Sequence, residues 1–184
     1  SNNTVPVRVE VESPWQAGLT FSSMTYWKGG SILRMILQTL GEDSFKRAIN
    51  HYLTRHAYDS VSTDDLWTAF TEQAAEDGIT DTDGSVLDFK EKFDPWVDQA
   101  GFPLLTVHQT QDGEANVYQT RFLYPSDQDI NIPSPWDYNW HVPITFTTED
   151  SSEWYIETKS WLDLENKTLT DGIPTMDKWL VLNI

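Results

Sequence analysis

The sequence contains no cysteine, which excludes disulfides, a thiolate nucleophile and cysteine-ligated zinc or iron–sulfur sites, although it does not fix the compartment. Basic residues are few: 12 lysines and arginines stand against 29 acidic residues, which gives a net charge of −17. Without a cluster of basic residues to contact phosphates, we expect no nucleic acid partner and no binding to anionic membranes. No apolar run approaches about 18 residues, so direct membrane insertion is not expected. The polar first residues predict no signal peptide.

Hydrophobic residues make up 39% of the 184 residues and nine tryptophans are present, which is enough for a folded core. The length fits one domain of ordinary size or two small ones. Apolar residues recur at helical spacing before Gly101, whereas short alternating runs follow it. We therefore expect an α+β chain in two segments, with a helical segment at 1–101 and an antiparallel β-sandwich at 102–184.

The first two helices are predicted from apolar spacing. Alternating valines predict a short strand at 5–12, and an apolar stripe predicts a helix at 22–40 that ends before Gly41. Asp43 is the expected N-cap of the second helix, which follows at once.

The next two helices are predicted from capping residues. Ser62 and Asp65 have the spacing of a weak capping box at the start of the third helix. The fourth is expected over 86–99 with an interruption, because Asp94 as N-cap and Pro95 at the first helical position would restart it.

The second segment contains short runs of apolar and β-branched residues separated by turn residues. A glycine turn at 111–113 predicts a hairpin between the first two runs. Together the runs predict a sandwich of five to seven strands. The strand candidates are 104–109, 116–124, 140–148, 154–162 and 178–184.

No group of residues has the spacing of a known metal site. No two histidines lie four residues apart on a helix, so no zinc ligands are expected among them. Asp81 and Asp83 before Gly84 hint at an EF-hand loop, but its first and twelfth positions lack carboxylates, so we expect a solvated acidic loop. The four histidines are His51, His56, His108 and His141.

Signals for other catalytic chemistry are weak. Residues 28–31, Lys-Gly-Gly-Ser, could cradle an anion near a helix start but match no phosphate-binding fingerprint. The preferred interpretation is that the two glycines let the helix approach a neighbouring element closely. No nucleophile elbow is present, and no pair of carboxylates stands out for glycoside hydrolysis.

Aromatic residues of the second segment leave a binding function open. If these aromatic side chains form an exposed cluster, the segment would suit a non-catalytic sandwich module that binds a glycan or a protein partner. Dispersed and buried, they would indicate core residues of an enzyme fragment. The residues concerned are Trp136, Tyr138, Trp140, Trp154 and Trp161.

Residues 21–35, FSSMTYWKGGSILRM, closely resemble a segment of the aminopeptidase N family of zinc metallopeptidases, the gluzincin aminopeptidases. Each further motif is modest, but together they follow the family order and span nearly the whole chain. These motifs lie at 40–45, 52–58, 63–67, 96–107, 119–123, 140–145 and 179–183.

The resemblance implies that the chain is a fragment: the helical end of a thermolysin-like catalytic domain, joined to the β-sandwich that follows it without its last strand. In the family the zinc ligands precede the segment at 21–35. The resemblance therefore implies zinc in the parent enzyme, no zinc bound by this fragment, and no activity of the fragment alone. The implied partners are the parent's peptide substrate, which loses its N-terminal residue, and the remaining domains of the same chain.

The resemblance assigns one catalytic residue, Tyr26. In the family this phenol lies opposite the zinc, and its hydroxyl hydrogen-bonds the oxyanion that forms when water attacks the peptide carbonyl. Two departures stand out. Trp27 occupies a position that is usually small or polar, and Pro95 interrupts a helix that is usually uninterrupted.

Two N-glycosylation sequons, at 2–4 and 166–168, agree with an extracellular location, in the ectodomain of a membrane-anchored parent. The family also has cytosolic members, so a cytoplasmic location stays open.

Overall fold

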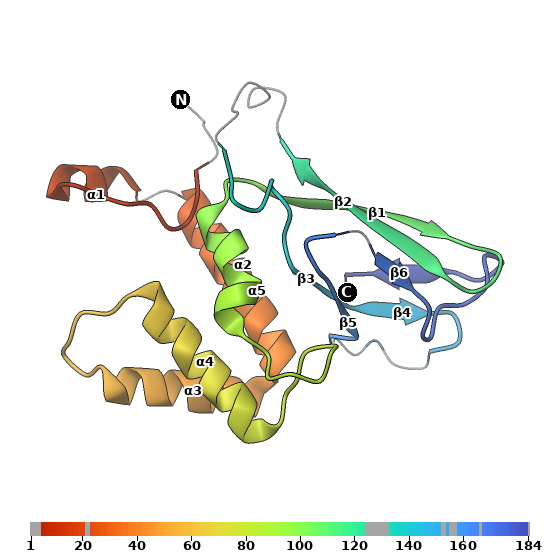
Figure 1. Ribbon diagram of the computed structural model, residues 1–184, viewed down its shortest axis with the longest axis horizontal. Helices are drawn as coiled ribbons and strands as arrows, with labels where there is room; N and C mark the ends of the chain where they lie inside the picture. The colour runs from red at the N-terminus through yellow and green to blue at the C-terminus, as the bar shows by residue number, and fades with distance from the viewer. Residues whose placement is uncertain are drawn as a thin grey trace.

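The computed structural model describes residues 5–20, 23–123, 133–151, 154, 158–165 and 167–183. In this part of the chain five helices precede seven short strands, and Figure 1 shows the helices on one side and the strands on the other. The helices are α1 (Pro14–Thr20), α2 (Ser23–Leu40), α3 (Glu42–Arg55), α4 (Thr63–Asp77) and α5 (Phe89–Asp98). The strands are β1 (Phe102–Gln109), β2 (Ala115–Phe122), β3 (Val142–Ile144), β4 (Phe146–Thr148), β5 (Ser160–Leu162), β6 (Lys167–Leu169) and β7 (Leu180–Leu182). An α+β fold is confirmed.

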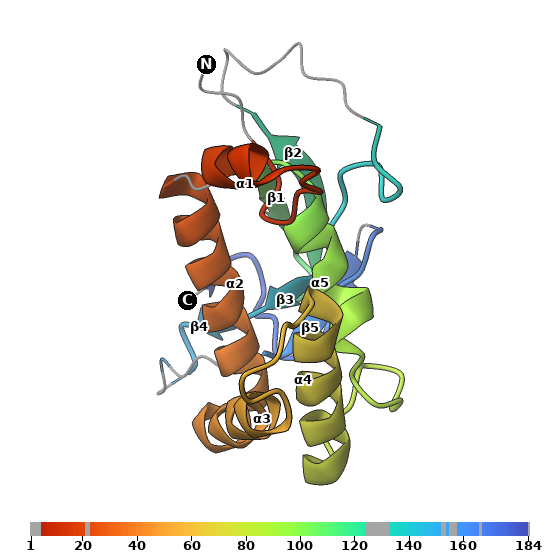
Figure 2. The same ribbon diagram turned by 90° about the vertical axis from the view of Figure 1, so that its left-hand side faces the viewer.

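Aromatic side chains join the helices to one another and to the strands. Phe70 of α4 stacks on Phe45 of α3, with ring centroids 5.4 Å apart, and contacts Phe89 of α5 at 5.5 Å. Phe93, one turn further along α5, meets Trp161 of β5 edge to face at 6.1 Å. One hydrophobic core therefore runs through both segments. Figure 2 shows α2 and α5 next to each other, with α3 and α4 at their lower ends.

The capping box at α4 is confirmed, because the Ser62 side chain accepts a hydrogen bond from the Asp65 amide and the Asp65 side chain accepts one from the Ser62 amide. The N-cap predicted for the second helix is wrong. α3 begins two residues earlier than that cap implies, after Gly41, whose φ of 78° lies in the left-handed region that glycine tolerates. Asp43 lies in the first turn of α3 instead.

The predicted interruption of the fourth helix is also wrong. Asp88 is the N-cap of α5, and its carboxylate accepts hydrogen bonds from the amides of Lys90 and Glu91. Pro95 lies inside the helix. The Asp94 carboxylate cannot act as the predicted cap because it accepts a 2.9 Å hydrogen bond from the Trp67 indole and pairs with cationic side chains.

Residues 5–12 do not form the predicted strand. The Arg8 amide donates to the Val97 carbonyl of α5 at 2.9 Å, and the Arg8 guanidinium donates to the Asp98 carboxylate at 2.6 Å. The segment is therefore bound to the end of a helix rather than to a strand. The helix α1, at Pro14–Thr20, was not predicted.

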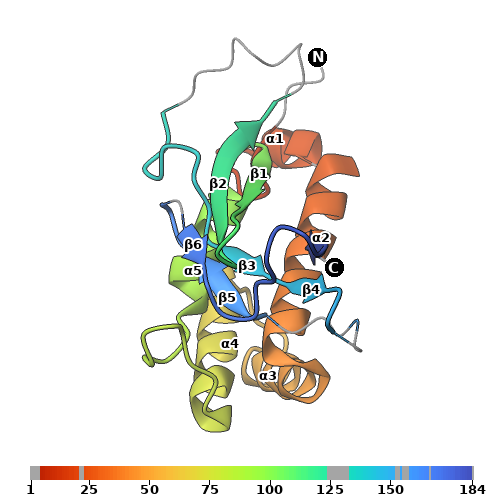
Figure 3. The same ribbon diagram turned by 90° about the vertical axis from the view of Figure 1, so that its right-hand side faces the viewer.

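The strands form three small antiparallel sheets with the orders β1-β2-β6, β3-β5 and β4-β7. The β1–β2 hairpin agrees with the predicted turn, and Figure 3 shows it in front of the helices. The described residues do not join these sheets into a closed sandwich, and β6 was not predicted. Of the candidate strand at 154–162 only β5 is formed, and residues 155–157 lie outside the described residues.

The charged side chain of Lys92 lies in the interface between the helices and the strands. Its side chain is almost fully buried, and its ammonium lies 2.6 Å from the Asp81 carboxylate and 2.8 Å from that of Asp163. Burial by itself lowers the pKa of Lys92, but the hydrogen bonds to Asp163 and Asp81 outweigh it, so the net shift is upward. The ammonium also lies over the Trp161 ring, at 5.4 Å from the centroid. Lys92 thus stays charged and ties α5 to the strands.

Replacing Lys92 with Met should lower the free energy of unfolding of this chain by about 1–3 kcal/mol, because the Asp81 carboxylate loses its charged donor in a poorly solvated place. Lys90→Met on the same helix is the matched control. Its ammonium is half exposed and pairs with Asp64 and Asp94, so about 1 kcal/mol or less should be lost. Urea unfolding of the three proteins measures both values, and equal losses would contradict the prediction.

Candidate functional site

Tyr26 lies in the first turn of α2, on the side of the helix that faces away from the core. Its side chain is 69% exposed, and that of the neighbouring Trp27 is 78% exposed. Further along α2, Ile32 and Ile36 are buried in the core. The phenol is therefore accessible at one end of the helical layer.

Lys28, two residues after Tyr26, points the other way. Its ammonium donates to the carbonyl of Gln99, the C-cap residue of α5, at 2.6 Å. Arg121 of β2 approaches from the strand side, and its Nε donates to the neighbouring Ala100 carbonyl at 3.1 Å. Two cations thus bind carbonyls just beyond the C-terminus of α5, where a helix leaves carbonyls without internal partners.

The turn between α5 and β1 is closely packed on β2. Gly101 has a φ of 92°, and a Cβ added there would lie 3.2 Å from the Phe122 carbonyl oxygen. A side chain at Gly101 would therefore require both a strained backbone and a shift of the strand.

The Gln99 side chain fixes the same turn from a third direction. Its amide donates to the Asn139 carbonyl at 2.8 Å, and its carbonyl accepts from the Ser134 hydroxyl at 2.6 Å. Gln99 is 2% exposed. The acceptor of the Lys28 hydrogen bond is therefore held by several elements at once.

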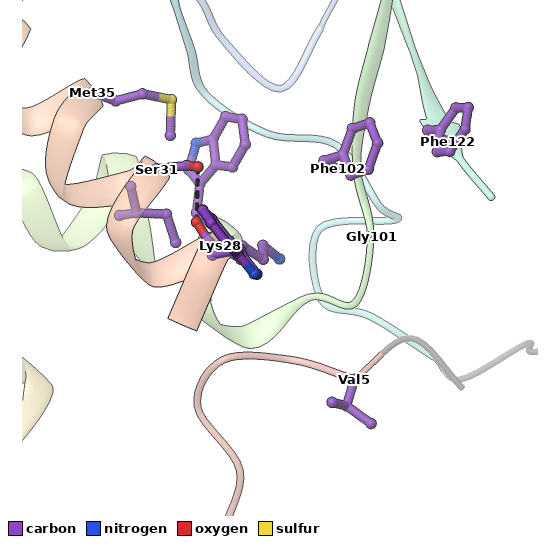
Figure 4. Close-up of a pocket in the computed structure, with 10 residues that line it drawn as sticks. Val5, Lys28, Ser31, Met35, Gly101, Phe102 and Phe122 are labelled. Carbon is purple, nitrogen blue, oxygen red and sulfur yellow. Dashed lines mark hydrogen bonds between the residues drawn. The ribbon is translucent and has the colours of Figure 1, made fainter. Parts of the chain in front are cut away.

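A cavity of about 220 Å³ lies between α2 and the beginning of the strands. Figure 4 shows Lys28 directed from α2 toward the segment that carries Gly101, with Phe102 and Phe122 on the strand side. Apart from Lys28 and Ser31 the lining is almost entirely apolar, and it includes Trp27. Burial is the main cause that lowers the pKa of Lys28, to about 8; repulsion from Arg121 adds to it and attraction by Asp98 opposes it.

The two glycines after Lys28 do not bring the helix close to another element, as their sequence suggested. A Cβ added at Gly29 or Gly30 would meet no atom within 4 Å. The preferred interpretation of residues 28–31 is therefore wrong. The residue of this motif that contacts another element is Lys28. The sequence analysis considered this lysine only as part of an anion cradle.

Within the described ranges no group of three or more histidine, aspartate or glutamate side chains is arranged to hold a metal ion. His141 lies 3.0 Å from the Asp163 carboxylate, in the cluster around Lys92. Asp81 of the acidic loop pairs with Lys92, and Asp83 accepts hydrogen bonds from Ser85. The residues described here do not form a site for the zinc that the resemblance implies.

The aromatic residues that suggested a binding platform are dispersed. Trp140 and Trp161 are buried in the core, whereas Trp136 and Tyr138 are half-buried. Trp154 is 65% exposed and stacks on Trp179, with ring centroids 6.0 Å apart. By the criterion set from the sequence, this distribution favours a fragment of an enzyme over a binding module.

Comparison with known protein families shows the class of protein to which the chain belongs. The sequence pattern of the peptidase family M1 domain matches residues 1–96. The chain belongs to this family of peptidases. It is 31% identical to mouse (Mus musculus) aminopeptidase N over 175 residues, which are 95% of this chain and 17% of the mouse protein.

Two further relatives support the family. The chain is 31% identical to human (Homo sapiens) endoplasmic reticulum aminopeptidase 1, covering 100% of this chain and 20% of that protein. It is also 31% identical to bovine (Bos taurus) glutamyl aminopeptidase, covering 91% of this chain and 15% of that protein. The chain thus spans a fifth or less of the length of these relatives. None of the described helices is both long and apolar enough to cross a membrane.

The lowered pKa of Lys28 predicts a pH dependence of stability. Between pH 8 and about 10.5 the unfolded chain keeps a proton on Lys28 that the folded chain has released, so the Lys28 contribution to the unfolding free energy should rise with pH in this window. Below pH 8 both states hold the proton and the contribution should be constant.

Urea unfolding of the wild type and Lys28→Met at several pH values from 7 to about 10.5 isolates this contribution, because other titrating groups cancel in the difference. The wild type should gain stability relative to the variant as the pH rises. A difference that does not change with pH would refute the assignment.

Proposed function

We propose that this chain is part of an aminopeptidase that removes N-terminal residues from peptides, and that Tyr26 is a catalytic residue of it. The single observation that carries the proposal is the Tyr26–Lys28 motif at the start of α2, with the phenol exposed and the lysine anchored in the core. Family membership and aminopeptidase relatives agree with this reaction class.

The role proposed for Tyr26 is to donate a hydrogen bond from its hydroxyl to the oxygen of the scissile carbonyl. When water attacks that carbonyl, the oxygen becomes negatively charged, and a donor already in place stabilises this charge without reorganisation. The bond is stronger to the oxyanion than to the neutral carbonyl, so the phenol acts mainly in the transition state. A phenol on a helix turn that is fixed from the opposite face is suited to this role.

The zinc ion that family peptidases use for such hydrolysis would be bound by residues outside this chain. When bound, it would polarise the carbonyl and activate water. The contribution of this chain is then limited to the phenol and to the strands that connect the catalytic region with the remaining domains of the parent.

We also propose that the parent is extracellular and membrane-anchored, as its two sequons suggest. The asparagines of both sequons lie outside the described residues. Glycosidase treatment of the full-length protein taken from the membrane fraction of cells that express it, followed by mass measurement, tests this location.

The isolated chain should hold no stoichiometric zinc through dialysis and should not hydrolyse aminoacyl-anilides. The described residues supply no group of ligands for the ion, and Tyr26 cannot activate water alone. Metal analysis and an activity assay on the purified chain check both points. A chelator-sensitive turnover would show that the chemistry resides in these residues after all.

In the full-length enzyme, Tyr26→Phe should lower kcat by roughly 10²–10³ and change KM far less, because the hydrogen bond to the oxyanion is stronger in the transition state than in the ground state. The phenylalanine ring preserves the apolar contacts, so the fold should be unaffected.

Steady-state kinetics on an aminoacyl-anilide measures the two constants, with Tyr58→Phe, a change at a fully exposed phenol elsewhere in the chain, as the control. If kcat stayed within about threefold while KM rose tenfold, Tyr26 would bind substrate rather than stabilise the oxyanion.

A further inference from the structure

We propose that Lys28 is a positioning residue for Tyr26: its hydrogen bond to the Gln99 carbonyl sets the rotation of the first turns of α2 and thereby the place of the phenol. The proposal rests on the proposed catalytic role of Tyr26 and adds to it a residue that contacts neither substrate nor the reacting atoms.

Lys28 and Tyr26 point to nearly opposite sides of α2. Residues two positions apart on an α-helix point in directions about 200° apart, so an anchor at Lys28 orients Tyr26 toward the opposite side. Lys28 continues the buried stripe of Ile32 and Ile36 by one turn toward the N-terminus of α2. The lysine is therefore an anchor two residues from Tyr26, on the buried side of the helix.

The helix is weak just after the anchor. Gly29 and Gly30 lie inside α2, and each glycine costs about 1 kcal/mol relative to alanine in a helix interior. Neither glycine has a neighbour within 4 Å of an added Cβ, so packing does not offset this cost. The turn that carries Tyr26 is thus joined to the well-packed part of α2 through two glycines, which have no side chains to pack against a neighbouring element.

The carbonyl that accepts the Lys28 hydrogen bond is held by several neighbouring groups. The Gln99 backbone follows α5 directly, and its side chain is bound by Asn139 and Ser134. Arg121 binds the next carbonyl, and the backbone at Gly101 lies so close to β2 that an added Cβ would be 3.2 Å from the Phe122 carbonyl oxygen. A hydrogen bond to this point therefore fixes the helix relative to both the helical layer and the strands.

Lys28→Met removes the ammonium and keeps most of the apolar stem, so it tests the anchor. In the full-length enzyme we expect kcat on an aminoacyl-anilide to fall about 10- to 100-fold with KM within about threefold, since a displacement of about 1 Å can cost 10²-fold. Lys28→Arg, which keeps a donor of similar reach, should recover most of kcat.

Combining Lys28→Met with Tyr26→Phe shows whether Lys28 acts through the phenol. Once the hydroxyl is gone its position is irrelevant, so Lys28→Met should lower kcat by less than about threefold in the Tyr26→Phe background. An equal loss in both backgrounds would overturn the proposal, and so would an unchanged kcat in Lys28→Met alone. If Tyr26→Phe itself kept full kcat, the catalytic role of Tyr26 would fail instead.

Lys92→Met is the control for a merely structural effect. It should destabilise the fold from a place near the other end of α5 and keep kcat per folded molecule, with the folded fraction measured by circular dichroism. A fall of kcat in Lys92→Met as large as in Lys28→Met would show that general loosening explains both variants, and would overturn the positioning role.

Discussion

The burial of α5 on two sides is the constraint on which the rest of the structure depends. Helices pack on one side of it and strands on the other, so its buried residues include Phe89, Phe93 and Trp96. On these two sides of the helix no solvent is available to satisfy a charged side chain or a terminal carbonyl. Lys92 therefore needs the carboxylates of Asp81 and Asp163, and the carbonyls at its C-terminal end need donors from neighbouring elements.

These requirements determine where the candidate site can lie. The donors at the C-terminal end of α5 come from α2 and β2, so the helix that carries the phenol and the strand that follows the turn meet at one point. Three motifs that are far apart in the sequence, around Lys28, Gln99 and Arg121, thereby become neighbours. Their residue types are explained by one local need, which is to satisfy two carbonyls in a place shielded from water.

Local signals in the sequence predicted local structure well. The Ser62–Asp65 capping box and the β1–β2 hairpin depend on contacts between residues close in sequence, and both are formed. Predictions failed where a partner distant in the sequence determines which structure a segment forms. Asp94 resembles a cap, but the Trp67 indole and neighbouring cations engage its carboxylate. The alternation at 5–12 resembles a strand, yet the available partner is the Val97 carbonyl of a helix.

In the candidate site too, a motif close in sequence could be predicted and a contact between distant residues could not. Tyr26 could be selected from the sequence because a family resemblance identified its motif, whereas the partner of Lys28 could not, because 71 residues separate the lysine from Gln99. The Lys-Gly-Gly run was interpreted through its glycines, although a Cβ added at either glycine would meet no atom within 4 Å and the lysine makes the contact. Two glycines in a helix weaken it, and a weak helix end places a phenol reproducibly only if something outside the helix holds it. A lysine on the opposite face, bound to a carbonyl that several elements fix, provides that hold without occupying the space in front of the phenol.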